Sequence, residues 1–355
     1  DSIQRSARDV ERRYRDGDLM TEPVKLLEVD SLCVDYLGID ADARACNDVS
    51  FTLHRGEILG VAGESASGKS TLLTAIMRLQ KPPAVIASGA IRYYSPAGKV
   101  IDLARASEDQ IRPLRWVDLA IVMQSAMACL NPVMRLGKQF DDVLAVHNPR
   151  MDKKARQERA VSLLEDVGIG PDAMTRYPHE LSGGMRQRSL IALALACDPE
   201  LIVMDEPTTA VDVVMQRQIL DEILALQEKL GFSVIFVTHD LSLLLEIADR
   251  IAIMYAGKLI EIADGEDLAD DPIHPYSRGL RDAFPSLTQP KRKFHEIPGT
   301  PPDLLNLPPG CPFAPRCEFR EARCEEKPPA LIELGGRRSV ACPVMVERRN
   351  DHARN

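Results

Sequence analysis

The segment GESASGKST, residues Gly63–Thr71, constrains the fold of this chain more than any other part of the sequence. It fits the pattern G-x4-G-K-[ST], which cradles phosphate groups where it joins a strand to a helix. The apolar run Ile58–Ala62 before it predicts a buried parallel strand, and TLLTAIMRL after it predicts a helix. Backbone N–H groups and the helix dipole would then both face an anion. An ordinary Gly/Ser turn is the alternative interpretation, and both flanks disfavour it.

Two side chains of this loop have predicted roles in binding a nucleoside triphosphate. We expect Lys69 to reach the β- and γ-phosphates and the Ser70 hydroxyl to ligate Mg²⁺. The glycines let the backbone turn its N–H groups toward the phosphates. The predicted ATP-binding residues of the loop are Gly63, Glu64, Ser65, Ala66, Ser67, Gly68, Lys69, Ser70 and Thr71.

Two adjacent acids, Asp205 and Glu206, follow the apolar run Leu201–Met204 in LIVMDEP. In an open α/β sheet, ligands bind at the carboxyl ends of the strands. We expect Asp205 to hold Mg²⁺, directly or through water, and Glu206 to polarise the water that attacks the γ-phosphate. Neighbouring carboxylates need a cation or a proton to coexist, and Mg²⁺ would supply the charge. An exposed helix start is the alternative explanation for these acids.

The distribution of apolar residues predicts the architecture. Short apolar runs such as Leu201–Met204 and Val234–Val237 are each followed by helical patterns, which favours a doubly wound α/β core. The stretch from about 152 to 195 has helical periodicity. After about Gly265 proline becomes dense and helical periodicity fades, so we place a domain boundary there. We find no internal repeat.

Charge and hydropathy narrow the classes of function. The net charge of −9 argues against a nucleic-acid-binding protein. No segment approaches 18 uninterrupted apolar residues, and the charged N-terminus has no apolar core of a secretory signal. We therefore expect a cytoplasmic chain that would act at a membrane only by docking onto a partner. Residues 1–22 are polar and form a predicted N-terminal extension.

The segment YPHELSGGMRQR resembles the LSGGQ signature of ABC ATPases, with Met185 in the usual place of glutamine. A Ser-Gly-Gly turn at a helix N-terminus exposes N–H groups and suits an anion. The resemblance implies that this turn caps ATP held by a partner cassette, so that ATP joins two cassettes and hydrolysis releases them. The signature residues are Leu181, Ser182, Gly183, Gly184 and Met185.

Other cassette positions follow in register over about residues 24–265. The resemblance implies that Tyr36 stacks on adenine and that Gln124 contacts Mg²⁺ and senses the membrane partner. It also makes Asp212 the acid of the D-loop, and His239 a switch residue on the γ-phosphate. Each of these residues alone would indicate little, and their joint order gives them weight. The implied catalytic residues are Glu206, His239, Gln124 and Lys69, and the implied Mg²⁺ ligands are Ser70, Gln124 and Asp205.

The resemblance also implies a fold and a set of partners. The expected fold class is α/β: a P-loop ABC ATPase core over residues 23–265, with an antiparallel β subdomain and a helical subdomain at about 125–195. A small C-terminal Cys-rich lobe would follow at 266–355. The implied partners are a second, homologous but different ABC ATPase subunit, two transmembrane permease subunits and an extracytoplasmic solute-binding protein, with no nucleic acid. Permease helices would dock near residues 124–136, at the cytoplasmic face of the inner membrane.

Two C-terminal stretches, HPYSRGL and IPGTPPDLLNLPPGCPFAPRC, resemble the extension of oligopeptide/dipeptide permease ATPases. That family imports peptides, and its relatives move nickel or oligosaccharides, so the cargo stays open. Four cysteines here suit zinc or an iron–sulfur cluster, although the tight C-x2–4-C pairs typical of structural zinc are missing. The family resemblance favours a [4Fe–4S] cluster, and unliganded thiols are the third possibility. The residues concerned are Cys311, Cys317, Cys324 and Cys342.

Four other cysteines, Cys33, Cys46, Cys129 and Cys197, are expected to be free core thiols.

Two rival functions remain. One is a soluble ABC ATPase acting on DNA or ribosomes, which would carry a long coiled coil or two cassettes. The other is a regulatory cassette that binds ATP without splitting it, which the intact Glu206 disfavours.

Overall fold

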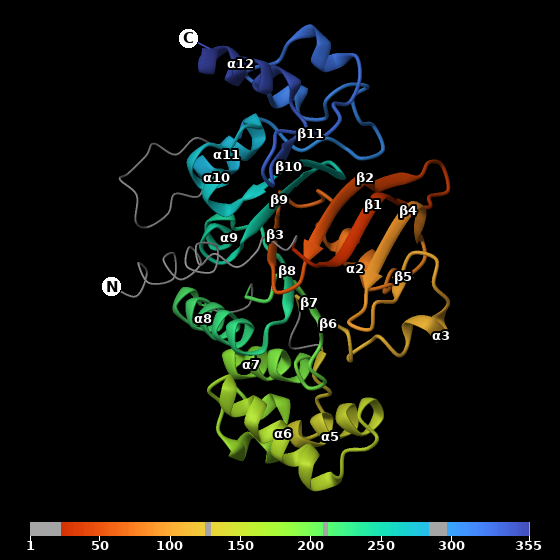
Figure 1. The fold of residues 1–355 in the computed structure, drawn as a ribbon, viewed down its shortest axis with the longest axis vertical. Helices are drawn as coiled ribbons and strands as arrows, with labels where there is room; N and C mark the ends of the chain where they lie inside the picture. The colour runs from red at the N-terminus through yellow and green to blue at the C-terminus, as the bar shows by residue number, and fades with distance from the viewer. Residues whose placement is uncertain (1–22, 125–128, 209–211, 284–296, 355) are drawn as a thin grey trace.

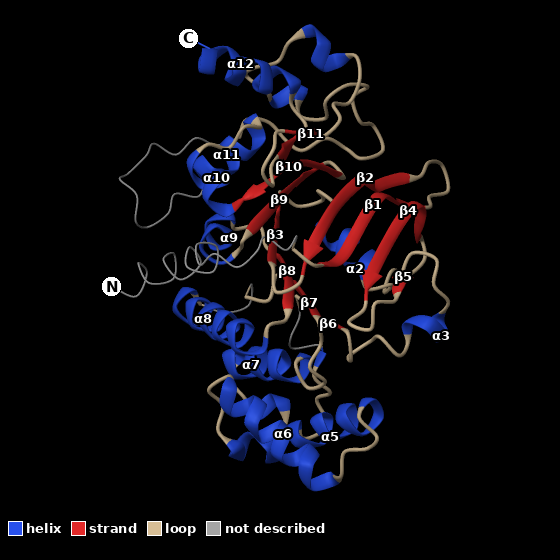
Figure 2. Ribbon diagram, viewed as in Figure 1, coloured by secondary structure: helices blue, strands red, loops and turns tan. Residues whose placement is uncertain are grey.

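The computed structural model describes residues 23–124, 129–208, 212–283 and 297–354, and the statements below concern these residues. The predicted extension at 1–22 lies outside them. Figure 1 shows two sheets in the middle of the molecule, a group of helices at the bottom, and the C-terminal region at the top. Figure 2 separates the central strands from the surrounding helices by colour.

The main sheet has eight strands in the order β11-β12-β10-β9-β3-β8-β7-β6. The five strands from β9 to β6 are parallel. Every residue of β3, β7, β8 and β9 is buried, which explains their continuous apolar sequences. The strands are β3 (Ile58–Ala62), β6 (Leu119–Val122), β7 (Leu201–Asp205), β8 (Ser233–Val237), β9 (Arg250–Tyr255), β10 (Lys258–Asp264), β11 (Ile332–Glu333) and β12 (Ser339–Val340). The predicted parallel strands are confirmed.

Alternate residues of each central strand pack into separate cores on the two faces of this sheet. In β8, Val234 and Phe236 join the core that includes the helices α7 to α9. Ile235 and Val237, between them, join the core shared with α2 and the second sheet. This alternation follows from the twofold period of a strand, and it holds the strand ends in fixed positions.

The second sheet is antiparallel, with the strand order β2-β1-β4-β5. Its core contacts include Leu32 on β1 and Leu72 on α2, so the sheet covers one face of the α/β core. The antiparallel β subdomain is thus present (Figure 2). Its elements and the helices around it are β1 (Lys25–Tyr36), β2 (Ala43–His54), α2 (Lys69–Ile76), β4 (Ala84–Tyr94), β5 (Val100–Asp102) and α3 (Glu108–Ile111).

Helices between β6 and β7 form the group at the bottom of Figure 1. The predicted helical stretch is confirmed in α6 and α7, with short 3-10 turns between them. Asp152 caps α6 by accepting from the Ala155 N–H over 2.8 Å. The elements are α5 (Leu136–His147), α6 (Lys153–Asp166), η1 (Pro171–Thr175), η2 (Pro178–Glu180) and α7 (Gly183–Ala194), with α8 (Val213–Leu230) and α9 (Leu241–Ile247) after β7 and β8.

The C-terminal region is more helical than its sequence predicts. The dense prolines suggest fading helices, yet Pro275 and Pro343 each stand at a helix start, where a missing N–H costs nothing. The region also extends the main sheet, because β12 pairs with β10 across the boundary placed at about 265. Its elements, besides β11 and β12, are α10 (Gly265–Asp270), α11 (Pro275–Ala283), η3 (Ala314–Arg316), η4 (Ala322–Glu325) and α12 (Pro343–Arg354).

No helix in the described part of the chain is long and apolar enough to cross a membrane. All eight cysteines are free. Cys33, Cys46 and Cys197 are buried as expected, whereas Cys129 is exposed, which corrects its assignment to the core. It stands between β6 and α5, outside the packed layers.

Candidate ATP-binding site

The phosphate loop joins β3 to α2 and requires glycine at two positions. Gly63 and Gly68 have φ angles of 152° and 101°. A Cβ atom on Gly63 would lie 2.3 Å from the Met254 carbonyl oxygen, and one on Gly68 would lie 2.2 Å from the Ala45 carbonyl oxygen. Backbone on β9 and β2 thus leaves no room for a side chain. The loop is shaped by tertiary contacts as well as by its own sequence.

Lys69, the first residue of α2, folds back onto the loop. Its Nζ donates to the carbonyl oxygens of Gly63 and Glu64 over 2.7 and 2.9 Å. Burial lowers the pKa of Lys69, while the charges of Glu206, Asp205 and Glu64 act in the opposite direction. A buried ammonium beside open backbone N–H groups suits a polyanion, because the phosphates would complete its pairing.

Asp205 ends β7 directly opposite the loop. Its Oδ1 accepts a hydrogen bond from Ser70 Oγ over 3.4 Å. Burial raises the pKa of Asp205, and the neighbouring Glu206 raises it further. This hydroxyl–carboxylate pair fits Mg²⁺, which binds proteins through one or two such groups and takes its other ligands from phosphates and water.

Glu206 joins two further predicted residues. Gln124 Nε2 donates to one carboxylate oxygen over 2.8 Å, and His239 Nδ1 lies 3.3 Å from the other. The three side chains follow the carboxyl ends of β6, β7 and β8, which are adjacent strands. Glu206 itself has a φ of 46°, a strained conformation for a residue with a side chain. Such strain costs roughly 1–3 kcal/mol and concentrates at functional sites.

Tyr36 lies at the end of β1 on the other side of the loop. Its hydroxyl is 3.2 Å from Thr71 Oγ1, and 38% of the residue is exposed. An exposed aromatic face beside the phosphate loop is available for stacking on a planar base. The structure therefore brings Tyr36, Lys69 and Asp205 to one edge of the core.

The signature segment starts α7, which packs in the core on the opposite face of the main sheet from α2. Ser182 caps this helix by accepting from the Met185 N–H over 3.2 Å. Nothing lies within 4 Å of a Cβ built on Gly183, whereas one on Gly184 would lie 2.6 Å from Met215 Sδ. The absence of a side chain at Gly184 thus lets α7 pack closely against α8. At Gly183 it leaves space at the surface for another molecule to approach the backbone.

Asp212 caps α8 by accepting from the Met215 N–H over 2.9 Å. It lies on the exposed surface at the helix start. Residues 209–211 of the predicted D-loop lie outside the described residues. The structure therefore gives the position of the D-loop acid and leaves the rest of that loop undescribed.

Comparison with known proteins matches two family models to this chain. The ABC transporter model covers residues 46–209, and the model for the oligopeptide/dipeptide transporter C-terminal region covers residues 260–324. A peptide import ATP-binding protein of Brucella abortus (strain 2308) is 42% identical over 92% of this chain and 96% of its own length. The dipeptide transport ATP-binding protein DppD of Bacillus subtilis (strain 168) is 40% identical over 93% and 97%.

The chain belongs to the ATP-hydrolysing subunits of the oligopeptide/dipeptide ABC transporter family. Solved structures agree with this assignment for the cassette. The dimeric ATP-binding cassette MJ0796 bound to ADP and Pi superposes with a TM-score of 0.59 at 25% identity, covering 67% of this chain and 98% of that one. The protein cbiO1 from Clostridium perfringens shares the fold, with a TM-score of 0.58. The ABC ATPase fold predicted from the sequence is confirmed, whereas the separate Cys-rich lobe is not.

The C-terminal cysteines of this ABC ATPase do not form a single-ion site. Within the described ranges, no group of three or more His, Cys, Asp and Glu side chains could hold a metal ion. The zinc alternative therefore has no support from the geometry, and the [4Fe–4S] cluster stays a prediction.

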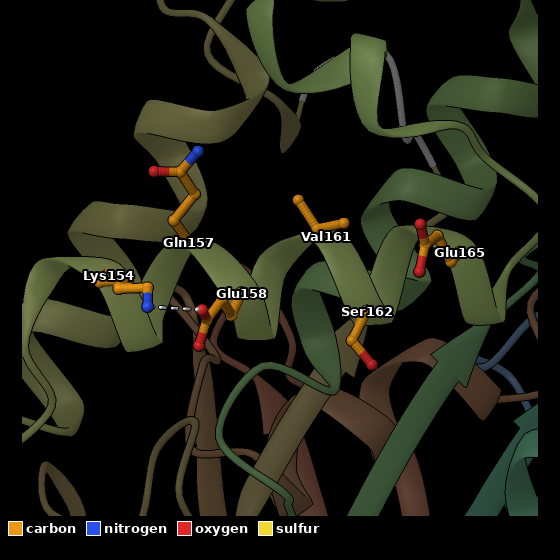
Figure 3. Close-up of a pocket in the computed structure, with 6 residues that line it drawn as sticks. All are labelled: Lys154, Gln157, Glu158, Val161, Ser162 and Glu165. Atoms are coloured by element: carbon orange, nitrogen blue, oxygen red, sulfur yellow. Dashed lines mark ion pairs between the residues drawn. The ribbon is translucent and has the colours of Figure 1, made fainter.

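A surface pocket lies on α6 of the ABC cassette, in the helical group (Figure 3). Its lining side chains are charged or polar except for Val161, and an ion pair of 3.6 Å joins Lys154 to Glu158. All lining residues come from one helix, and none belongs to the predicted ATP site. They are Lys154, Gln157, Glu158, Val161, Ser162 and Glu165.

Sequence reasoning missed two side chains of this ABC ATPase that touch the phosphate loop. Arg316 and Tyr276 come from the C-terminal region, and both bind Glu64. The only sequence signals were their places in the segments that resemble the permease extension, HPYSRGL and CPFAPRC. Neither segment indicated a contact with the loop.

Proposed function

We propose that this chain hydrolyses ATP to drive the import of di- or oligopeptides that an extracytoplasmic binding protein delivers. It would sit at the cytoplasmic face of the inner membrane, bound to two transmembrane permease subunits. The names of the relatives support the peptide cargo, and the C-terminal family model supports the subfamily. Oligosaccharide or nickel import by the same machinery is the alternative cargo.

The observation that carries the proposal is the hydrogen-bonded group of Gln124, Glu206 and His239 beside the loop of Lys69. In the proposed reaction, Lys69 binds the phosphates and Tyr36 stacks on adenine. Ser70 and Asp205 would hold Mg²⁺, with Gln124 as a further contact, and the ion would neutralise charge on the phosphates.

Hydrolysis needs a base and a group that responds to the γ-phosphate. Glu206 would orient and polarise the attacking water, since its carboxylate already stands at the end of β7 between two polar partners. His239 would contact the γ-phosphate from the adjacent strand. Gln124 would couple the state of the nucleotide to the permeases, because it begins the segment of this chain, residues 124–136, where they are proposed to dock.

A second cassette, homologous to this chain and different from it, would complete the site. The capped N-terminus of α7 and the open space at Gly183 support an anion from outside the chain. The related cassette MJ0796 was solved as a dimer with ADP and Pi. Ser182 and Gly183 would thus bind the triphosphate held by the partner cassette, with Leu181, Gly184 and Met185 shaping the turn and Asp212 nearby in the D-loop.

We further propose the division into an extension at 1–22, a nucleotide-binding domain at 23–265 with its helical part at about 125–195, and a C-terminal domain at 266–355. The C-terminal domain would hold a [4Fe–4S] cluster of structural or regulatory role. Burial raises the pKa of Cys342, and the charges of Cys311, Cys317 and Cys324 raise it further, which supports a common neighbourhood for the four sulfurs. Such a cluster holds its ligands farther apart than one ion does.

Burial raises the pKa values of Cys311 and Cys317. Backbone N–H groups act in the opposite direction and only partly offset burial: those of Phe313 and Ala314 on Cys311, and that of Phe319 on Cys317. Without a cation these thiols would stay protonated at neutral pH, so a positively charged group would fit the site.

The transport proposal is tested on the assembled complex of this chain, its partner cassette and the permeases in proteoliposomes. Binding protein loaded with a di- or tripeptide should raise ATPase activity several-fold over unloaded binding protein. Maltooligosaccharide and Ni²⁺ serve as the comparison solutes. Stimulation by either of these and not by peptides would overturn the peptide assignment, while ATPase activity without any solute dependence would overturn transport itself.

A further inference from the structure

Two segments of the C-terminal region converge on one residue of the phosphate loop. Arg316 donates from Nη1 and Nη2 to the two carboxylate oxygens of Glu64 over 2.7 and 3.0 Å. Tyr276 accepts from the Glu64 backbone N–H over 2.8 Å. The first contact spans 252 positions of sequence and the second 212. Glu64 is therefore bound through both its side chain and its backbone by the far end of the chain.

Contacts other than the one with Glu64 also fix the side chain of Arg316 in place. Its side chain is 5% exposed, and it donates to the Pro298 carbonyl over 2.7 Å and to the Tyr255 hydroxyl over 3.2 Å. The guanidinium also lies 5.8 Å from the ring centroids of Tyr255 and Phe313. A buried, bidentate arginine with its donors occupied has little freedom to leave its partner.

Tyr276 is likewise held in place, by ring packing and by hydrogen bonds. It is fully buried, and its ring centroid lies 4.6 Å from that of Tyr255 and 5.5 Å from that of Phe313. Its N–H donates to His274 Nδ1, and the His274 N–H donates to the buried Glu261 on β10. The hydroxyl is thus held against the loop by the main sheet.

A shift of Glu64 would change both the position of Lys69 and the charge beside the proposed phosphate site. Its carbonyl accepts from Lys69 Nζ over 2.9 Å, so the backbone that Tyr276 holds also positions the phosphate-binding lysine. The Glu64 carboxylate also places a negative charge in the loop that is proposed to bind the triphosphate. Arg316 neutralises that charge, and without the arginine the acid would repel the phosphates.

We propose that Arg316 and Tyr276 are positioning residues for ATP binding, and that the C-terminal region sets the affinity of the phosphate loop through Glu64. This inference rests on the proposed function, because it concerns the same nucleotide. Neither residue needs to touch ATP. Arg316 acts on the charge and place of the Glu64 side chain, and Tyr276 acts on its backbone.

The test measures KM for ATP and kcat in the assembled transporter. Arg316→Ala should raise KM about tenfold or more, because the acid is left unpaired, with kcat changed by less than about threefold. Arg316→Ala combined with Glu64→Gln should recover most of that loss. A purely structural role for the arginine would show no such recovery. Arg316→Lys should give an intermediate KM, because it keeps the charge and loses the bidentate geometry.

Arg320→Ala is the matched control, since Arg320 pairs with Glu325 on the surface of the same region and does not reach the loop. It should leave KM unchanged. Tyr276→Phe keeps the ring and removes the acceptor, and should raise KM about threefold. If Arg316→Ala does not assemble, Arg316→Lys and Tyr276→Phe still decide the matter, and normal KM in both overturns the inference.

Lys69→Ala separates this inference from the proposed function. If Lys69→Ala also leaves KM unchanged, the ATP site itself is misassigned. If Lys69→Ala raises KM and Arg316→Ala does not, only the role of the C-terminal region is wrong. An Arg316→Ala loss that Glu64→Gln deepens would likewise overturn the charge argument.

Discussion

Gln124 donates a hydrogen bond of 2.8 Å to the carboxylate of Glu206, joining the end of β6 to the end of β7. The contact places Gln124, which begins the segment proposed to face the permeases, on the proposed base. A change in the position of Gln124 would thus alter the orientation of Glu206. In the proposed complex, this side-chain contact would link a permease docked at residues 124–136 to the carboxylate of Glu206.

Glu206→Gln should keep ATP binding and lose turnover. The amide preserves shape and hydrogen bonding and cannot act as a base, so kcat should fall by at least about a hundredfold. ATPase rates and nucleotide affinity in the assembled complex are the measurements. Glu158→Gln on the exposed face of α6 is the control. Brisk hydrolysis by Glu206→Gln would refute the role given to this carboxylate.

Lys69→Ala should weaken nucleotide binding itself. The contact proposed for Lys69 is a charge-assisted hydrogen bond to phosphate, worth about 1.5–3 kcal/mol, so affinity should drop roughly ten- to a hundredfold. Titration with ATP measures it, and Lys153→Ala at the start of α6 should bind normally. Equal affinities for the two variants would contradict the assignment.

Gly183→Ala and Gly184→Ala should separate function from packing. Gly183 faces open space, so its methyl group should leave the melting temperature unchanged and reduce ATPase activity by blocking the partner's nucleotide. Gly184 faces Met215, so its methyl group should cost about 1 kcal/mol in stability. Thermal melts and ATPase rates distinguish the two. Full activity in Gly183→Ala would remove the signature from the nucleotide interface.

Asp205→Asn should stabilise the nucleotide-free protein at neutral pH while abolishing Mg²⁺-dependent hydrolysis. Burial raises the folded-state pKa of Asp205 above its ordinary value of 3.8, so the folded protein holds this proton more tightly than the unfolded chain does. The charged carboxylate therefore destabilises the fold above the raised pKa, and this penalty disappears as pH falls toward the ordinary value.

The stabilisation by Asp205→Asn should accordingly shrink as the pH falls from neutral toward the ordinary pKa of 3.8. Melting temperatures of the variant and the parent across that range are the measurement. Asp198→Asn, on an exposed acid between α7 and β7, is the control. A gain that is constant with pH would show that burial of the charge is not its cause.

Protein purified without oxygen should contain about four irons and four sulfides per chain if the cysteine cluster is a [4Fe–4S] site. Cys317→Ser should lose most of both, and Cys129→Ser, on the surface outside the region, should lose neither. Iron and sulfide assays together with absorbance spectra report the outcome. Protein with intact thiols that lacks both elements would exclude the cluster.

The central fold and the phosphate loop could be predicted because their signals are local. Ile58–Ala62 is apolar throughout, since both its faces are covered, and the glycines follow at once. The contacts of Glu64 could not be predicted, because Arg316 lies 252 positions away and no pattern near either residue refers to the other. The sequence did not predict the C-terminal helices for a different reason. Proline predicts a helix break unless it is known to lie in the first turn of the helix.

The two shortest strands of the main sheet have a protective consequence. β12 pairs with β10 and β11 pairs with β12, each over only two residues. A chain ending after β10 would present an unpaired strand edge that another molecule could extend. The brief C-terminal pair covers the middle of that edge, at Glu261 and Ile262, and its own two-residue strands offer another chain little to extend.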